Sequence, residues 1–218
     1  MNTPGHIQRP RIAILDYGMG NLRSVEKALA RVGADPVVTA DHDVVRGADG
    51  VILPGVGAFP KAMHNLREIE LDVLLGDRLA AGVPTLGICL GLQLLFEASS
   101  ENDGAWGLGL LQGRVERLPA PGLKIPHIGW NAVHWTKGSR LTAELPEQCS
   151  FYFVHSFAPV VTSETDVLGT ADYGDAFACA VEHEPLYGVQ FHPEKSSTHG
   201  LRLLENFAGI CAAVGAPS

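Results

Sequence analysis

Cys89 stands between two glycines in the stretch GICLGLQ, residues 87–93, and its surroundings make it a candidate for a reactive thiol. An apolar run precedes it and leucine-rich residues follow, which is the strand–turn–helix layout of a nucleophile elbow. Gly87 and Gly91 keep the turn free of side chains. A helix N-terminus favours thiolate, and the N–H of Leu90 would point toward a developing oxyanion. A buried structural cysteine is the competing interpretation, and the motif alone leaves both open.

His192 and Glu194 follow a β-type run in GVQFHPEKS, residues 188–196. Pro193 restricts the backbone between them, so imidazole and carboxylate are held in a defined relation. A cysteine nucleophile needs a base to take and return its proton, and that base needs an orienting group. Alternatively, His192 is simply one of nine histidines and Glu194 a solvated carboxylate. Zinc deaminases also carry H-x-E, but they need a downstream P-C-x-x-C, and only Cys211 follows, so we expect no metal.

The segment LPGVGAF, residues 53–59, places Gly55, Val56 and Gly57 after another predicted strand. In isolation PGVG is consistent with an ordinary turn. At the carboxyl end of a parallel strand, however, it lies on the edge where α/β proteins build their sites, and glycines let the backbone approach and reorient. Its N–H groups are therefore candidate oxyanion donors. The earlier stretch DYGMGN lacks both the G-x-G-x-x-G spacing and a Walker lysine, so we expect no nucleotide cofactor.

Alternating strands and helices must position these residues. Strand-type runs at 11–16, 35–40, 49–55 and 83–90 alternate with helical patterns at 22–33, 71–82 and 90–99. From about residue 108 the runs are shorter and separated by turn signals, as in antiparallel or mixed strands, and a last helix is expected at about 199–214. This order predicts an α/β fold whose mostly parallel central sheet is flanked by helices. We expect a disordered N-terminal tail at 1–10 and a single domain at 11–214.

The composition limits the class of function. The chain has 218 residues and a formal net charge of −8, without a basic run that would attract nucleic acid. No apolar stretch is long enough to span a membrane, and the first ten residues lack the apolar region of an export signal. Four scattered cysteines without a CxxC pair suggest a reducing compartment. We therefore expect a cytoplasmic protein with no nucleic-acid or membrane partner.

Taken together, these motifs resemble those of the class I (triad) glutamine amidotransferases. The resemblance is narrower to the glutaminase subunits of imidazole glycerol phosphate synthase, an enzyme of histidine biosynthesis. It rests on DYGMGN, PGVGAF, GICLGLQLLFE, IPHIGWN, YFVHSF and GVQFHPEKSS in that order, from about Arg11 to the last helix. Sister amidotransferases share the elbow and the HPE element, but typically lack PGVGAF, PHIGWN and FVHSF.

The resemblance implies a reaction and a set of residue roles. Cys89, His192 and Glu194 fall on the catalytic triad of the family, which releases ammonia from L-glutamine without a cofactor. Val56 would supply an oxyanion donor beside Leu90, and Gln93 would help to hold the substrate. In the family, ammonia passes to a (β/α)₈ cyclase subunit, which uses it to make imidazole glycerol phosphate and an aminoimidazole carboxamide ribonucleotide.

Three further positions match those that the family uses at the interface with the cyclase: Asn21, Trp130 and Lys195. For Trp130, the alternative is a tryptophan that fills the core. Other interpretations of the whole chain also stay open. They are a stand-alone γ-glutamyl hydrolase or peptidase on the same fold, a glutaminase subunit of another amidotransferase, and a non-catalytic binding module.

Overall fold

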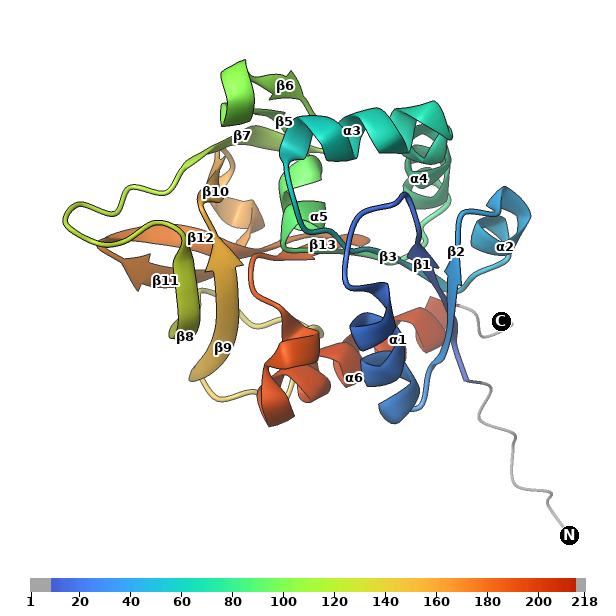
Figure 1. Ribbon diagram of the computed structural model, residues 1–218. Helices are drawn as coiled ribbons and strands as arrows, with labels where there is room; N and C mark the ends of the chain where they lie inside the picture. Colours follow the sequence, from blue (N-terminus) through green and yellow to red (C-terminus); the bar gives the residue numbers. More distant parts are fainter. Residues whose placement is uncertain (1–8, 215–218) are drawn as a thin grey trace, which may run out of the picture.

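A mixed nine-stranded sheet runs through the molecule, and helices cover both of its faces (Figure 1). The computed structural model describes residues 9–214. In spatial order the strands are β2 (Asp35–Thr39), β1 (Arg11–Leu15), β3 (Gly50–Leu53), β4 (Thr85–Ile88), β13 (Leu186–Val189), β12 (Asp175–His183), β11 (Val167–Tyr173), β8 (His127–Trp135) and β9 (Gln148–His155). The first five strands pair in parallel, and the pairs from β13 to β9 are antiparallel. The α/β fold is confirmed, and within this sheet parallel pairing is confined to the half that carries Cys89.

The helices divide into two layers because alternate residues of a buried strand point to opposite faces. On β1, Ile12 and Ile14 join one apolar core, whereas Ala13 and Leu15 join the other. The first core is covered by α1 (Leu22–Arg31) and α6 (Ser197–Val214), the second by α3 (Phe59–Glu68), α4 (Leu71–Ala80) and α5 (Leu90–Leu94). Figure 1 shows these two layers on opposite sides of the sheet, with the short α2 (His42–Arg46) beside α4.

A second, four-stranded sheet lies above the main one in Figure 1 and corrects one sequence prediction. Its order is β10 (Phe157–Val161), β7 (Leu111–Arg117), β5 (Phe96–Ser99) and β6 (Ala105–Trp106). The helix predicted over 90–99 is wrong in its second half, because α5 ends at Leu94 and the chain continues into β5. Pairing with β7, at Phe96↔Leu111 and Ser99↔Val115, outweighs the local helical pattern.

The structure describes only the last two residues of the predicted N-terminal tail at 1–10. Residues 1–8 of the expected tail lie outside the described residues. Pro10 is buried, and its carbonyl accepts a hydrogen bond of 2.9 Å from the N–H of Asp35. The described elements run from Arg11 at the start of β1 to Val214 at the end of α6, and a single domain at 11–214 stays a prediction.

We expect Gly91→Ala to destabilise the protein, because a Cβ at this position would overlap with the backbone carbonyl of Leu53 on β3. Overpacking of this kind typically costs ~1–3 kcal/mol of the free energy of unfolding, which urea denaturation measures. Gly76→Ala in α4 is the matched control, since nothing lies within 4 Å of its Cβ position. Removing that helical glycine should stabilise the protein by ~0.5–1 kcal/mol. Similar unfolding energies for the two variants would contradict the close packing of α5 on β3.

Candidate active site

Cys89 sits at a strained turn between β4 and α5. Its φ of 55° and ψ of −109° lie outside the conformations that L-residues ordinarily adopt. A Cβ on Gly87 would come within 2.8 Å of the Leu92 nitrogen, so side chains are excluded from the turn. Such a turn lifts the nucleophile out of the sheet, as expected for an elbow. Because α5 has only five residues, its dipole gives less support to a thiolate than the longer predicted helix would have.

His192 and Glu194 form a buried pair directly after β13. Nδ1 of His192 lies 2.9 Å from Oε1 of Glu194, and the two side chains are 3% and 1% exposed. The other atoms of the pair, Nε2 of His192 and Oε2 of Glu194, are buried and have no hydrogen-bond partner among the described residues. Ser196 fixes the turn, because its hydroxyl donates to the His192 carbonyl and accepts from the N–H of Tyr152 on β9.

The surroundings of His192 favour its protonated form. Burial lowers its pKa, but the interactions with the sulfur of Cys89 and the carboxylate of Glu194 outweigh burial and raise the pKa to about 9. Cys89 and Glu194 therefore both lie close enough to act on the imidazole. With Nδ1 engaged by Glu194, Nε2 is the nitrogen that is free to exchange a proton with the thiol.

The PGVG segment packs against the elbow, but one predicted donor is already occupied. The N–H of Leu90 points at the carbonyl of Gly55 at 3.4 Å. Tyr17 anchors the same segment by donating from its hydroxyl to the carbonyl of Pro54 at 2.5 Å. Gly57 has a φ of 109°, and Val56 is 40% exposed. The segment is therefore next to the nucleophile, with its main-chain carbonyl directed toward the position where an oxyanion would need donors.

A cavity of about 280 Å³ opens beside Cys89. Its lining comprises Val56, Gly57, Cys89, Leu90, Gln93, Glu101, Pro126, Val154, His155, Ser156 and Phe157. Glu101 is the carboxylate in this lining, and its Oε2 accepts from the N–H of Phe59 at 2.8 Å. No motif in the sequence pointed to Glu101, which reaches the cavity only because β5 leads the chain back past α3.

Comparisons with known proteins assign the chain to a family. The sequence matches the family described as "Glutamine amidotransferase class-I" over residues 13–210. The chain belongs to this family. It is 51% identical over 204 residues to "Imidazole glycerol phosphate synthase subunit HisH" of Moorella thermoacetica, covering 94% of this chain and 97% of that one. The HisH subunit of Aquifex aeolicus is 50% identical, with 90% and 95% covered, so the chain is placed among the HisH subunits.

Solved structures agree on the fold. A crystal structure titled as a glutamine amidotransferase superposes with a TM-score of 0.72 at 21% identity, covering 92% of this chain and 98% of that one. PurLQS from Thermotoga maritima gives a TM-score of 0.74 at 18% identity, covering 93% and 99%. The narrower resemblance to the glutaminase subunits of imidazole glycerol phosphate synthase is thereby confirmed by the relatives, and the fold by the structures.

The three residues that the amidotransferase resemblance assigns to an interface lie on the surface. Asn21 precedes α1, Trp130 is on β8, and Lys195 ends the 3₁₀ turn η3 (Pro193–Lys195). All three are exposed, and Trp130 is 56% exposed, so the alternative of a core tryptophan is wrong. Trp130 pairs with Tyr152 on β9. The N–H of Tyr152 donates to the hydroxyl of Ser196, the residue after Lys195, so Trp130 and Lys195 both lie beside Tyr152.

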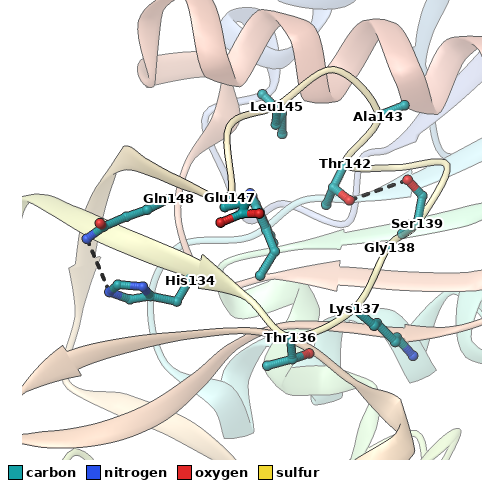
Figure 2. Close-up of a pocket in the computed structure, with 11 residues that line it drawn as sticks. His134, Thr136, Lys137, Gly138, Ser139, Thr142, Ala143, Leu145, Glu147 and Gln148 are labelled. Carbon is teal, nitrogen blue, oxygen red and sulfur yellow. Dashed lines mark hydrogen bonds between the residues drawn. The ribbon is translucent and has the colours of Figure 1, made fainter.

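Another cavity, of about 620 Å³, lies between the far end of β8 and the start of β9 (Figure 2). Figure 2 shows the side chains of His134 and Gln148 bonded to each other at its rim, 3.2 Å apart. None of the residues predicted to act in catalysis or substrate binding lines it.

Within residues 9–214 no group of three or more histidine, cysteine, aspartate or glutamate side chains is arranged to hold a metal ion. The helices described there include none long and apolar enough to cross a membrane.

We expect a glutamine-analogue electrophile to label Cys89 and to spare Cys149, Cys179 and Cys211. All four thiols are free and buried, but of these only Cys89 lines the cavity beside the elbow. Burial also raises the pKa of each of the other three, which keeps them as thiols. Mass spectrometry of the labelled protein locates the adduct, and Cys89→Ala should remove it without a change in the circular dichroism spectrum. A label found chiefly on another cysteine contradicts the assignment of the nucleophile.

We expect Glu194→Gln to lower the pKa of His192 from about 9 toward its ordinary value of 6.5, because the charge of Glu194 and part of its hydrogen bonding are lost. An NMR titration of the imidazole measures this shift. A raised pKa stabilises the fold below pH 6.5, and this contribution disappears as the pH rises through 9. The stability gap between the wild type and Glu194→Gln should therefore be widest below pH 6.5, shrink between pH 6.5 and 9, and be smallest above pH 9. A gap that grows with pH would contradict the pairing.

Proposed function

We propose that this chain hydrolyses L-glutamine at Cys89 and delivers the ammonia to a (β/α)₈ cyclase subunit in the cytoplasm. Membership among the HisH subunits makes the chain a glutaminase subunit of imidazole glycerol phosphate synthase, which acts in histidine biosynthesis. The observation that carries the assignment of residues is the buried His192–Glu194 pair at 2.9 Å, with the strained Cys89 close enough to raise the pKa of His192. The cyclase would use the ammonia to form imidazole glycerol phosphate and an aminoimidazole carboxamide ribonucleotide.

The proposed reaction proceeds through a thioester. Nε2 of His192 takes the thiol proton, and the sulfur of Cys89 attacks the side-chain amide carbon of glutamine. His192 returns the proton to the amide nitrogen, so ammonia leaves and the glutamyl thioester remains. His192 then takes a proton from water, the hydroxide attacks the thioester, and the proton returns to the sulfur as glutamate is released. Glu194 holds Nδ1 and stabilises the imidazolium in both halves of the reaction.

The cavity supports binding of an amino acid with its side chain directed at Cys89. Glutamine carries an ammonium group, and the carboxylate of Glu101 in the lining offers it a counter-charge. Nε2 of Gln93 is already engaged by the carbonyl of Phe157 and by Gln190, so Oε1 of Gln93 is the atom left to accept from the substrate. Both residues are assigned here to substrate binding.

The oxyanion donors require a rearrangement. Gly55 contributes the carbonyl and Val56 the N–H of one planar peptide, so these groups point in opposite directions. Rotation of that peptide would withdraw the carbonyl from Leu90 and turn the N–H of Val56 toward the site. One oxyanion donor is typically worth ~10²–10³ in rate. The free chain would then rest in a state of low activity, and a partner that favours the rotated peptide would activate it.

Docking of the cyclase would take place on the exposed residues Asn21, Trp130 and Lys195. Ile128 is 60% exposed and stands two residues from Trp130 on the same face of β8, which adds apolar area beside the tryptophan. An exposed aromatic residue with an adjacent apolar side chain and a nearby lysine is a typical composition for a protein interface. Trp130 and Lys195 lie beside the turn that holds His192, so docking would also cover the site proposed to produce ammonia.

We expect low glutaminase turnover in the free chain, a rise when the cyclase subunit binds, and a further rise when the cyclase holds its nucleotide substrate. The physical reason is the occupied N–H of Leu90, which leaves the oxyanion without its donors until the peptide rotates. A coupled assay for glutamate measures the three rates. Equal rates in all three states contradict the switch and favour a stand-alone γ-glutamyl hydrolase.

Gly55→Val tests the same switch from within the chain. Its Cβ would come within 2.6 Å of the Tyr17 hydroxyl and 3.0 Å of the Leu90 Cβ, which leaves no room for the peptide to rotate. Activation by the cyclase should be blunted, while cyclisation supplied with ammonium salts continues. Gly138→Val is the matched control, because nothing lies within 4 Å of its Cβ position. Full activation of Gly55→Val would contradict the rotation.

A further inference from the structure

Gln190 is a fully buried carboxamide at the end of β13, and the proposed mechanism does not use it. The parallel register of β13 with β4 pairs Val189 with Ile88, so the next residues, Gln190 and Cys89, leave the two strands side by side. The N–H of Cys89 donates to the Val189 carbonyl at 2.8 Å and fixes this proximity. A primary amide without access to water costs free energy unless its polar atoms are paired.

Both ends of the Gln190 side chain have partners in the site. Its Oε1 lies 3.1 Å from Nε2 of Gln93, and its Nε2 lies 3.7 Å from the sulfur of Cys89. Nitrogen and oxygen of a carboxamide are assigned from the network around them, and here the network permits one assignment. The carbonyl of Phe157 can only accept, so the group of Gln93 that lies 2.9 Å from it must be the NH₂. Gln190 must then present its oxygen to Gln93, which turns its own NH₂ toward Cys89.

The second group at the sulfur is an acceptor. The sulfur of Cys89 lies 3.8 Å from the carbonyl of Val154, which accepts from it while it is a thiol. When His192 takes the thiol proton, that bond is lost and the negative sulfur faces a carbonyl dipole in a site where Cys89 is buried. The NH₂ of Gln190 is a donor that stays in place through this step, and hydrogen bonds to an ionised group are the stronger kind.

We propose that Gln190 is a further catalytic residue, whose side-chain NH₂ donates to the sulfur of Cys89 and stabilises the thiolate after the proton has moved to His192. No atom of Gln190 is transferred, and the proton passes only from the thiol to the imidazole. Through Oε1, Gln190 also positions Gln93 for the substrate. The inference rests on the proposed function in one respect, since it requires Cys89 to be the nucleophile.

The experiment measures the rate at which iodoacetamide alkylates Cys89 as a function of pH, with the site of modification identified by mass spectrometry. Gln190→Met keeps the length of the side chain and removes the donor. We expect the pH midpoint of alkylation to shift upward and the rate at pH 7 to fall roughly tenfold, the order expected for one hydrogen bond to a charged group. The plateau rate at high pH should stay the same, because the sulfur is then ionised in both proteins.

Two further variants separate this role from packing. Gln190→Glu keeps the volume of the side chain and an oxygen that can accept from Gln93. An ionised carboxylate beside the sulfur disfavours the thiolate, so the pH midpoint of alkylation should also move upward. It serves as the second variant if Gln190→Met does not fold, as judged by urea denaturation. Gln148→Met, on the exposed start of β9, is the control and should leave the midpoint unchanged.

The outcomes distinguish the inference from the proposed function. An unchanged midpoint in both Gln190 variants, with Cys89 still alkylated, overturns the role of Gln190 and leaves the nucleophile intact. A uniform change in rate at every pH, plateau included, indicates altered access to the sulfur and also overturns it. Alkylation chiefly at another cysteine in the wild-type chain contradicts the proposed function itself. An upward midpoint with an unchanged plateau supports donation from Gln190 to the thiolate.

Discussion

The whole site depends on the parallel pairing of β4 with β13 at the centre of the sheet. Residues about a hundred positions apart in sequence leave these two strands at the same edge, one as the elbow of Cys89 and the other as the turn that carries His192. Parallel strands end at a common edge, so a register fixed by buried side chains also fixes the distance between the proposed nucleophile and the proposed base. The antiparallel half of the sheet contributes Tyr152, whose carbonyl accepts from the N–H of His192 and holds that turn.

The carbonyl of Phe157 is the second group on which the site depends, because two polar side chains of the site form hydrogen bonds with it. It accepts from Gln93 and from Nδ1 of His155, which leaves Nε2 of His155 to accept from His127 at 3.0 Å. Burial and the neighbouring histidines lower the pKa of His155 to about 4 against the opposing hydrogen bond to Phe157, so the pair is neutral at pH 7. The ring N–H donors of His127 and His155 therefore both point toward the Phe157 carbonyl. Such a network gives the substrate cavity one arrangement of donors and acceptors.

The site combines parts of different rigidity. The His192–Glu194 pair is almost completely buried and is held by the hydroxyl of Ser196, so the groups proposed to transfer protons have one geometry. The segment around Gly55 and Val56 is exposed on one side and is held to the elbow by a single long hydrogen bond from Leu90. A rigid base beside an adjustable oxyanion segment would suit a glutaminase whose ammonia is used by a partner subunit. In the proposed switch, a movement of the oxyanion donors would change the rate while the base keeps its geometry.

The sequence alone determined the features whose signals are local. Three residues between two glycines define the elbow of Cys89, Pro193 spaces His192 from Glu194, and hydrophobic periodicity predicts the alternating strands and helices. What only the tertiary structure decided depends on contacts between distant segments. Residues 96–99 became a strand because β7 pairs with them, and Glu101 reached the cavity for the same reason. Gln190 meets Gln93 across 97 residues and Cys89 across 101, and no local pattern encodes a contact that the strand register creates.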